Sequence, residues 1–257
     1  MPRFAANLSM MFNEVPFLDR FEAAAKAGFK AVEFLFPYDF PVEEIAARLK
    51  QFGLTQALFN LPPGDWTKGE RGIAALAGRE AEFRQSLEIA KPYALATGVK
   101  RLHLMAGSVS RSETAALTRY KDAIRHAAET FAPHGIDILL EPLNTRDMPG
   151  YLLDSYDYAA ELITGLGIAN VKLQFDIYHC QILHGDVTMR MRAMFPIIGH
   201  VQVASIPSRH EPMSEELNDA FLFAELDRLG YQGFIGGEYR PKAGTEAGLG
   251  WFAPYRA

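Results

Sequence analysis

Four side chains with oxygen donor atoms stand at the ends of apolar runs, in four successive segments of the chain. They are Glu141 in LLEPLN, Asp176 in LQFDIYH, Gln202 in HVQVAS and Glu238 in GGEYR. A buried carboxylate is costly unless it is paired, hydrogen-bonded or bound to a cation. Without a basic partner the three carboxylates would repel one another, and a divalent cation would remove that repulsion. Mg²⁺ or Mn²⁺ suits these oxygen donors better than zinc, since neither the single Cys180 nor a histidine cluster indicates a softer metal.

The segments that must position these side chains alternate between two types. Short apolar runs rich in β-branched or aromatic residues are followed by longer amphipathic segments, and each pair takes about thirty residues. The predicted strands are 4–9, 31–36, 54–60, 101–107, 137–144, 171–179, 199–205 and 234–240. The predicted helices are 17–27, 42–52, 80–96, 113–132, 154–166, 187–195 and 218–229.

This alternation predicts the fold. The phrases KAGFKAVEF, ATGVKRLHL and RLGYQGFIG each end a helix, turn at a glycine and continue into a buried strand. Eight such strands in 257 residues predict an α/β protein with one (β/α)8 TIM barrel domain spanning 1–257. An open doubly wound sheet is the alternative, although no GxGxxG turn follows the first strand. Functional side chains of a barrel lie at the carboxyl ends of its strands, where the four oxygen donors stand. Each acid taken singly is also compatible with a helix cap.

Composition excludes several classes of protein. The chain is 49% hydrophobic and 22% charged, which is typical of a globular enzyme. Its 26 basic and 31 acidic residues give a net charge of -5 without a basic cluster, which argues against a nucleic-acid partner. One cysteine cannot form an internal disulfide. The N-terminus lacks the pattern of a signal peptide, and no run approaches the roughly 18 apolar residues of a membrane span. We therefore expect a soluble cytoplasmic protein.

Specific phrases occur along the whole chain. They are NLSMMF at 7–12, AVEFLFPY at 31–38, ALFNLPPGDW at 57–66, HLMAG at 103–107, FAPHGI at 131–136, RHEP at 209–212, and GEYRP and GLGWF near the end. With these phrases the sequence resembles the hydroxypyruvate isomerase family, which includes 2-oxo-tetronate isomerases, within the xylose isomerase-like barrel superfamily. The resemblance implies that Glu141, Asp176, Gln202 and Glu238 bind one divalent metal. In the related sugar epimerases a histidine often stands where Gln202 does, which weakens any transfer of their metal preference.

The resemblance also implies an activity, the interconversion of hydroxypyruvate and tartronate semialdehyde. A metal that chelates the substrate's carbonyl and hydroxyl oxygens would acidify the C–H bond between them and stabilise an enediolate. Glu141 and Glu238 would be the proton-transfer pair, because a glutamate bound through one oxygen keeps the other for a proton. The sequence does not assign which of them is the base and which the acid.

An oxo-acid substrate needs a cation in its pocket. Arg209, in RHEP, and Arg240, two residues beyond Glu238, are the two candidates, and a solvated arginine paired with an acid is the alternative for each. His179, three residues after Asp176, matches a substrate contact in related sugar isomerases. It is equally suited to orienting Asp176.

Other residues are weaker candidates for substrate contacts. His103 either lines the pocket or is a hydrogen-bonded core histidine. The segment 61–78 contains Trp66 and is expected to form a lid or side wall over the strand ends, with a surface excursion as the alternative. Glu33 in AVEFLF faces the barrel interior as a structural partner or as part of the site.

Three other functions compete with this one. A ketose 3-epimerase would use the same metal and glutamates, but with neutral rather than cationic pocket residues. An abasic-site endonuclease shares the barrel, but it needs more metal ligands and a basic surface. A sugar-acid binding protein would need no proton-carrying pair. The expected partner is a small-molecule 2-oxo acid or sugar acid, with no organic cofactor, and a homo-oligomer is compatible with the sequence.

Overall fold

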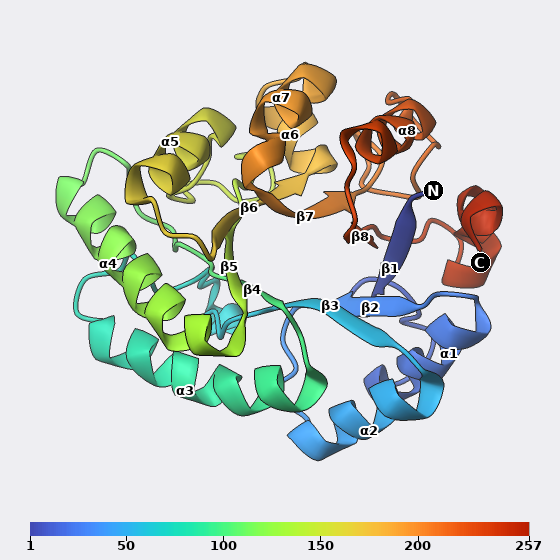
Figure 1. Ribbon diagram of the computed structural model, residues 1–257, viewed down its shortest axis with the longest axis horizontal. Helices are drawn as coiled ribbons and strands as arrows, with labels where there is room; N and C mark the ends of the chain where they lie inside the picture. The colour runs from blue at the N-terminus through green and yellow to red at the C-terminus, as the bar shows by residue number, and fades with distance from the viewer. Residues whose placement is uncertain (257) are drawn as a thin grey trace.

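Eight parallel strands close into a barrel in the computed structural model, which describes residues 1–256 (Figure 1). Each strand pairs with the next along the chain, and β8 returns to pair with β1. The strands are β1 (Arg3–Asn7), β2 (Ala31–Phe34), β3 (Thr55–Asn60), β4 (Arg101–His103), β5 (Asp137–Leu140), β6 (Val171–Asp176), β7 (Ile198–Val203) and β8 (Phe234–Gly237). The predicted TIM barrel is confirmed, and the open sheet is excluded.

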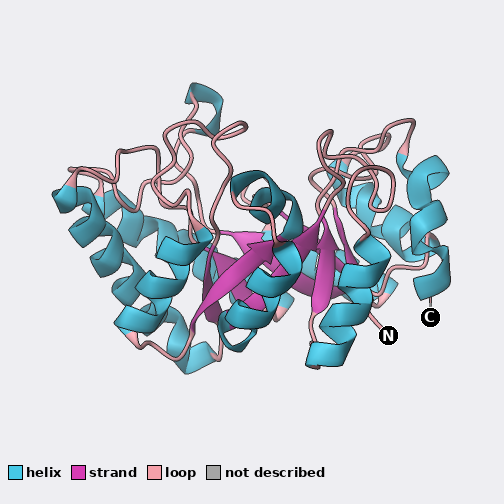
Figure 2. Cartoon of the chain, turned by 90° about the horizontal axis from the view of Figure 1, so that it is seen from above, coloured by secondary structure: helices cyan, strands magenta, loops and turns pink. Residues whose placement is uncertain are grey.

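The helices surround the barrel, and the longer loops gather at one of its ends (Figures 1 and 2). The α-helices are α1 (Arg20–Lys26), α2 (Val42–Phe52), α3 (Glu80–Thr97), α4 (Thr114–Phe131), α5 (Tyr156–Leu166), α6 (Ile177–Leu183), α7 (Val187–Met194), α8 (Asp219–Leu229) and α9 (Thr245–Gly248). Short 3₁₀ helices span Phe17–Asp19, Trp66–Lys68, Ala132–His134, Phe195–Ile197 and Leu249–Tyr255.

The strands begin within a residue of the predicted starts, but seven of the eight end earlier than predicted. The difference matters most at β6, where the predicted strand 171–179 was wrong in its last three residues. The Asp176 carboxylate accepts a hydrogen bond of 2.7 Å from the backbone N–H of Tyr178 and so caps α6. His179 therefore lies on a helix. Similarly, β8 ends at Gly237, so Arg240 lies three residues beyond the strand rather than at the end of the predicted strand 234–240.

Aromatic side chains pack around β1 on the outside of the barrel. The ring of Phe4 on β1 packs edge-on against Phe223 of α8 and Trp251, with centroids 4.9 and 5.0 Å apart. Phe252 stacks on Phe29 at 4.1 Å. The segment Leu249–Tyr255 thus covers the place where the first and last strands meet.

The segment 61–78 is held against the barrel at several points. The backbone N–H of Leu61 donates to the His103 carbonyl at 2.9 Å, and that of Ala75 donates to the Ala106 carbonyl at 2.9 Å. Glu70 pairs with Arg79 at 2.6 Å. Among the expectations for this segment, these anchors favour a fixed side wall over a loose surface excursion. Within residues 1–256, no helix has the length and apolarity needed to span a membrane.

Candidate active site

The four oxygen donors arrive at one end of the barrel from four successive strands. Glu141 directly follows β5, Asp176 ends β6, Gln202 lies in β7 and Glu238 directly follows β8. Their exposed fractions are 4%, 1%, 1% and 5%, so all four are buried. A cavity of about 120 Å³ opens beside them. Of the nine predicted site residues, seven line this cavity: Trp66, His103, Glu141, His179, Arg209, Glu238 and Arg240.

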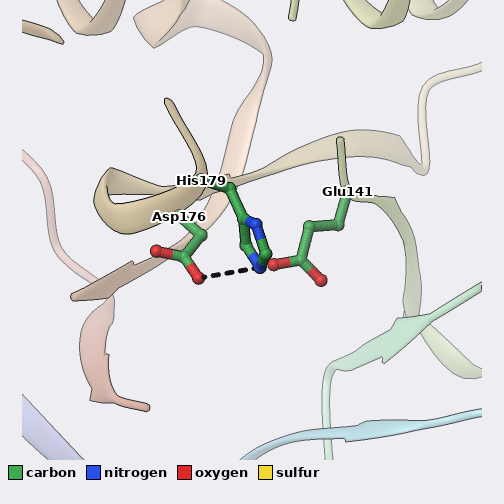
Figure 3. Close-up of side chains that lie close together, drawn as sticks. All are labelled: Glu141, Asp176 and His179. Carbon is green, nitrogen blue, oxygen red and sulfur yellow. Dashed lines mark ion pairs between the residues drawn. The ribbon is translucent and has the colours of Figure 1, made fainter. Parts of the chain in front are cut away.

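Two buried carboxylate oxygens in this group accept no hydrogen bond within the described part of the chain. Glu141 Oε1 and Asp176 Oδ2 accept no hydrogen bond from any residue in 1–256. Donor atoms of Glu141, Asp176 and His179 all lie within 4.8 Å of one another (Figure 3). Such oxygens are normally satisfied by a partner, so their convergence fits a small divalent cation.

Arg209 corrects the expectation that no basic side chain stands among the carboxylates. Its Nη2 is 2.6 Å from Glu238 Oε2 and 3.6 Å from Asp176 Oδ2, and the side chain is buried. Its Nη1 is 3.7 Å from an oxygen of Asp147. When ionised, the carboxylates of Glu141, Asp176 and Glu238 carry one charge each, so one guanidinium leaves two negative charges. A divalent cation would still be needed to neutralise the group.

Burial raises the pKa of all three carboxyl groups. The pKa of Glu141 lies well above its ordinary value because of burial and then the charges of Glu238 and Asp176. Burial raises the pKa of Asp176 to about 6. It raises the pKa of Glu238 to about 8, although the charge of Arg209 acts in the opposite direction. Two glutamates whose pKa values are raised by burial therefore border one cavity.

His179 turns one ring nitrogen, Nε2, toward the carboxylates. Its Nδ1 lies 2.9 Å from the backbone N–H of Asn144 and 2.8 Å from the side-chain amide of the same residue. Both groups donate, so Nδ1 accepts and Nε2 carries the proton. Burial lowers the pKa of His179 well below its ordinary value, so the ring is neutral. Nε2–H lies 3.7 Å from Asp176 Oδ2 and is suited to donate to a substrate oxygen rather than to bind a metal.

His103 comes from β4 and lies beside the first glutamate. Its Nδ1 is 3.4 Å from Glu141 Oε2, and its Nε2 has no partner among residues 1–256. Burial lowers the pKa of His103 to about 3, so the ring is neutral. It lines the cavity and also contacts a proposed proton carrier.

Both ends of the Gln202 amide form hydrogen bonds in the barrel interior. Its Nε2 donates to Glu33 Oε1 at 2.8 Å, and its Oε1 accepts from Gln174 Nε2 at 2.6 Å. A carbonyl oxygen has two lone pairs, so Oε1 retains one for another partner. Asp176 and Gln202 face each other in the β6–β7 register.

Arg240 and Trp66 form part of the wall. Arg240 is exposed, and within residues 1–256 its guanidinium makes no ion pair. It also lines a larger adjoining hollow of about 600 Å³. Trp66 packs against Phe36 with centroids 5.1 Å apart, and the Arg71 guanidinium lies over its ring at 3.8 Å.

Sequence reasoning missed several residues that orient the site. Asn144 holds His179, and Asp147 accepts a hydrogen bond of 2.9 Å from the Tyr178 hydroxyl while it faces Arg209. Asn144 is the last residue of the phrase LLEPLN, so its place at a strand end was a usable signal. Asp147 lies in the following loop, and nothing in the sequence indicated its partners.

Comparisons with known proteins agree with this architecture. A family model described as the xylose isomerase-like TIM barrel matches residues 21–255. The 2-oxo-tetronate isomerase of Cupriavidus necator is 55% identical over 257 residues, covering 99% of each chain. The hydroxypyruvate isomerase of Escherichia coli is 44% identical over 259 residues, covering 100% of each chain.

A solved structure extends the comparison to the whole fold. A protein from Brucella melitensis, described as an AP endonuclease of family 2, is 53% identical and superposes with a TM-score of 0.98 over 100% of both chains. The sequence matches and the superposition therefore cover the whole barrel and every residue of the site. The chain belongs to the xylose isomerase-like TIM barrel family and, within it, to the isomerases of the hydroxypyruvate isomerase type, a group that includes 2-oxo-tetronate isomerases.

Proposed function

We propose that the protein moves the carbonyl group between C2 and C3 of a short 2-oxo-3-hydroxy acid. With hydroxypyruvate the product is tartronate semialdehyde. One proton leaves C3, one is added at C2, and the hydroxyl proton passes from O3 to O2. The observation that carries the proposal is the pair of buried glutamates with raised pKa, Glu141 and Glu238. They border one cavity, beside carboxylate oxygens that accept no hydrogen bond within residues 1–256.

Glu141, Asp176, Gln202 and Glu238 would hold one divalent cation, Mg²⁺ or Mn²⁺ by the hardness of the oxygen donors. When bound, this ion supplies a Lewis acid that acidifies the C–H bond next to the substrate carbonyl and stabilises the enediolate charge. The hydrogen-bond-free oxygens Glu141 Oε1 and Asp176 Oδ2 support this assignment.

The two glutamates divide the proton transfer between them. A carboxylate with a pKa near neutrality removes a carbon-bound proton and returns it more readily than one with an ordinary pKa. One glutamate would take the C3 proton, and the other would deliver a proton to C2. The Nε2–H of neutral His179 would donate to a substrate oxygen as negative charge develops there.

The substrate carboxylate requires a cation, and Arg240 suits this role better than Arg209. Arg209 is already within 4.0 Å of three carboxylates, whereas Arg240 pairs with none in residues 1–256 and lines the cavity. The main role of Arg209 would then be to hold Glu238 in place, and a contact with the substrate would be a minor one. Trp66 and His103 would exclude water from the enediolate. An arginine at the cavity without an ion pair in the described residues, Arg240, favours an acid over the neutral ketose of an epimerase.

Relatives named for 2-oxo-tetronate are 46 to 55% identical to this chain, and the Escherichia coli hydroxypyruvate isomerase is 44% identical. We therefore propose that the four-carbon acid is the preferred substrate and that hydroxypyruvate is turned over by the same chemistry. We also propose that residues 1–257 act as one barrel domain in the cytoplasm, alone or as a homo-oligomer, without a nucleic-acid partner.

The test is a comparison of substrates by NMR. Chelator-treated protein is incubated with hydroxypyruvate or 2-oxo-tetronate, before and after addition of Mg²⁺ or Mn²⁺. We expect metal-dependent formation of the C3-oxo isomer from both, with a higher kcat/KM for the four-carbon acid. Turnover of a neutral ketose and of neither acid would instead support the epimerase, and binding without turnover would support the binding protein.

A further inference from the structure

A fourth buried carboxylate, Glu33 on β2, lies inside the barrel next to the proposed ligands. Its exposed fraction is 0%. Its Oε1 accepts from Gln202 Nε2 at 2.8 Å and from Asn7 Nδ2 at 3.1 Å, and its Oε2 lies 2.7 Å from His200 Nε2. Glu33 thus ties β2 to β1 and β7. A buried carboxylate in contact with three polar side chains from two other strands restricts the orientation of each of them.

The Glu33 carboxylate occupies space that a side chain on β8 would otherwise fill. Gly236 of β8 pairs in register with Gln202, and a Cβ atom at position 236 would overlap both oxygens of Glu33. The absence of a side chain at position 236 is therefore a condition for the present position of Glu33. Backbone strain is not the reason for this glycine, because its φ is not in the left-handed region.

The hydrogen bond between Glu33 and Gln202 determines which end of the Gln202 amide is free to bind a cation. A glutamine amide has an oxygen end, which can bind a cation, and an NH₂ end, which cannot. Glu33 is an acceptor at this position, so it holds the NH₂ end. The Gln202 oxygen then points away from Glu33, accepts from Gln174 at 2.6 Å and keeps one lone pair.

We propose that Glu33 is a positioning residue that orients the Gln202 amide so that only its oxygen can serve as a metal ligand. The inference rests on the proposed function, in which Gln202 is one of four ligands. Asn7 extends the same role to a second ligand, because its Nδ2 reaches both Glu33 Oε1 and Glu238 Oε1, the latter at 3.4 Å. Partners of metal ligands of this kind typically change metal affinity by about 10- to 100-fold when they are removed.

The experiment measures Mn²⁺ binding by electron paramagnetic resonance of the free ion, without substrate. E33M keeps the bulk of Glu33 but removes its acceptor oxygens, and we expect its dissociation constant to rise by about 10- to 100-fold. E33Q retains an acceptor oxygen and should keep most of the wild-type affinity. A wild-type dissociation constant in E33M would overturn the proposal.

E225M is the matched control. Glu225 on α8 is also a buried carboxylate, paired with Arg192 at 2.6 Å and with Arg228, but it lies outside the site. We expect E225M to unfold at a lower temperature while its Mn²⁺ affinity stays within about twofold of the wild type. An equal loss of affinity in E225M and E33M would show a general effect of destabilisation and overturn the proposal.

A second pair of variants tests orientation directly. The carboxylate of Q202E has an oxygen at both ends, so it needs no orienting partner. Q202E should therefore restore Mn²⁺ affinity when added to E33M, but not improve it when Glu33 is present, where the two carboxylates repel. The same change in affinity in both backgrounds would contradict the proposal.

Two further variants distinguish a failure of the role given to Glu33 from a failure of the proposed metal-ligand set. If E33M does not fold, G236A displaces the Glu33 carboxylate without altering it, and a wild-type affinity in G236A would overturn the inference. Q202L tests the ligand set itself. If Q202L binds Mn²⁺ as the wild type does, the proposed ligand set fails and this inference with it. If Q202L weakens binding and E33M does not, only the role of Glu33 fails.

Discussion

At the scale of single residues, Glu238 combines the features expected of a proton carrier. It is 5% exposed, it borders the cavity, and burial raises its pKa to about 8. Arg209 holds one of its oxygens at 2.6 Å, which fixes the carboxylate in one orientation. A group held in this way and protonated near neutral pH is suited to acid–base catalysis.

E238Q should keep the fold and lower kcat by about 10²- to 10⁴-fold, because an amide cannot exchange the proton. The measurement is steady-state turnover with saturating Mn²⁺ alongside a thermal melt. E246Q, which alters an exposed glutamate on α9, is the control and should retain the wild-type rate. A near-wild-type rate in E238Q would remove Glu238 from the proton-transfer pair.

The raised pKa of Glu238 also gives a pH dependence of stability for the metal-free protein. An unfolded chain ionises this glutamate near its ordinary pKa, whereas the folded chain keeps the proton up to about pH 8. The folded state therefore binds more protons between these values, and the free energy of unfolding falls as the pH rises. Between pH 7 and 8 the contribution of Glu238 to this fall should be about 1 kcal/mol per pH unit.

Urea unfolding of chelator-treated protein at several pH values measures this slope. E238Q should show a shallower fall, since the titrating group is gone. His103 and His179, whose pKa values are lowered by burial, add an opposing slope that fades as the pH rises above their unfolded pKa of about 6.5 and is small by pH 8. Stability that rises between pH 7 and 8 would be inconsistent with the buried, protonated glutamate.

The residue types of the site were predictable, but their pairing was not. Glu141, Asp176, Gln202 and Glu238 could be recognised because each polar group ends an apolar run. The position of Arg209 inside this group depends on the path of the loop after β7, which no local pattern specifies. The same holds for Asp147, which faces Arg209 from the loop after β5.

At the scale of elements, the wall segment 61–78 depends on a close approach to the loop after β4. A Cβ atom at Gly72 would overlap the backbone carbonyl of Met105, a residue that lines the cavity. Gly69 has a similar positive φ, 89° against 101°, but nothing lies within 4 Å of its would-be Cβ. A substitution at Gly69 therefore tests backbone strain alone, whereas one at Gly72 tests backbone strain together with steric overlap.

G69A should cost about 1 kcal/mol of unfolding free energy, from backbone strain alone. G72A should cost about 1–3 kcal/mol more, because the backbone of the wall or of the loop after β4 must shift. It should also raise KM, since Trp66 moves with the wall. Chemical denaturation and kinetics of both variants measure these effects. Equal costs for the two substitutions would mean that the wall is not held at Gly72.

The elements were predictable where hydrophobic period and turn glycines agree. The range Val42–Phe52 was correct at both ends because Pro41 precedes the helix and Gly53 ends it with a φ of 64°. The strands were predicted too long because apolar residues continue beyond the last ladder hydrogen bond. Residues 177–179 read as strand from their composition, but the Asp176 cap makes them the first turn of α6.

At the scale of the whole molecule, closure of the barrel depends on the C-terminal aromatic segment. Phe252 is 2% exposed and stacks on Phe29 at 4.1 Å with an interplanar angle of 6°. It also lies edge-on to Phe4 at 6.1 Å. The C-terminal end of the chain is thus part of the core that holds β1 next to β8.

F252A should lower the free energy of unfolding by about 3–5 kcal/mol, from lost burial and the cavity left behind. F221A, which removes a ring that is 49% exposed on α8, is the control and should cost far less. Urea denaturation compares the two. A small effect of F252A would show that the barrel closes without the C-terminal segment.

The central claim is that a pair of carboxylates moves a proton between C2 and C3 of the substrate. The most direct measurement is proton NMR of the metal-loaded protein with hydroxypyruvate in D₂O. Protons held on Glu141 and Glu238 exchange with solvent, so we expect deuterium at C2 of tartronate semialdehyde and gradually at C3 of the remaining substrate. A product that keeps protium at C2 throughout would indicate direct hydride transfer between the carbons and contradict the account.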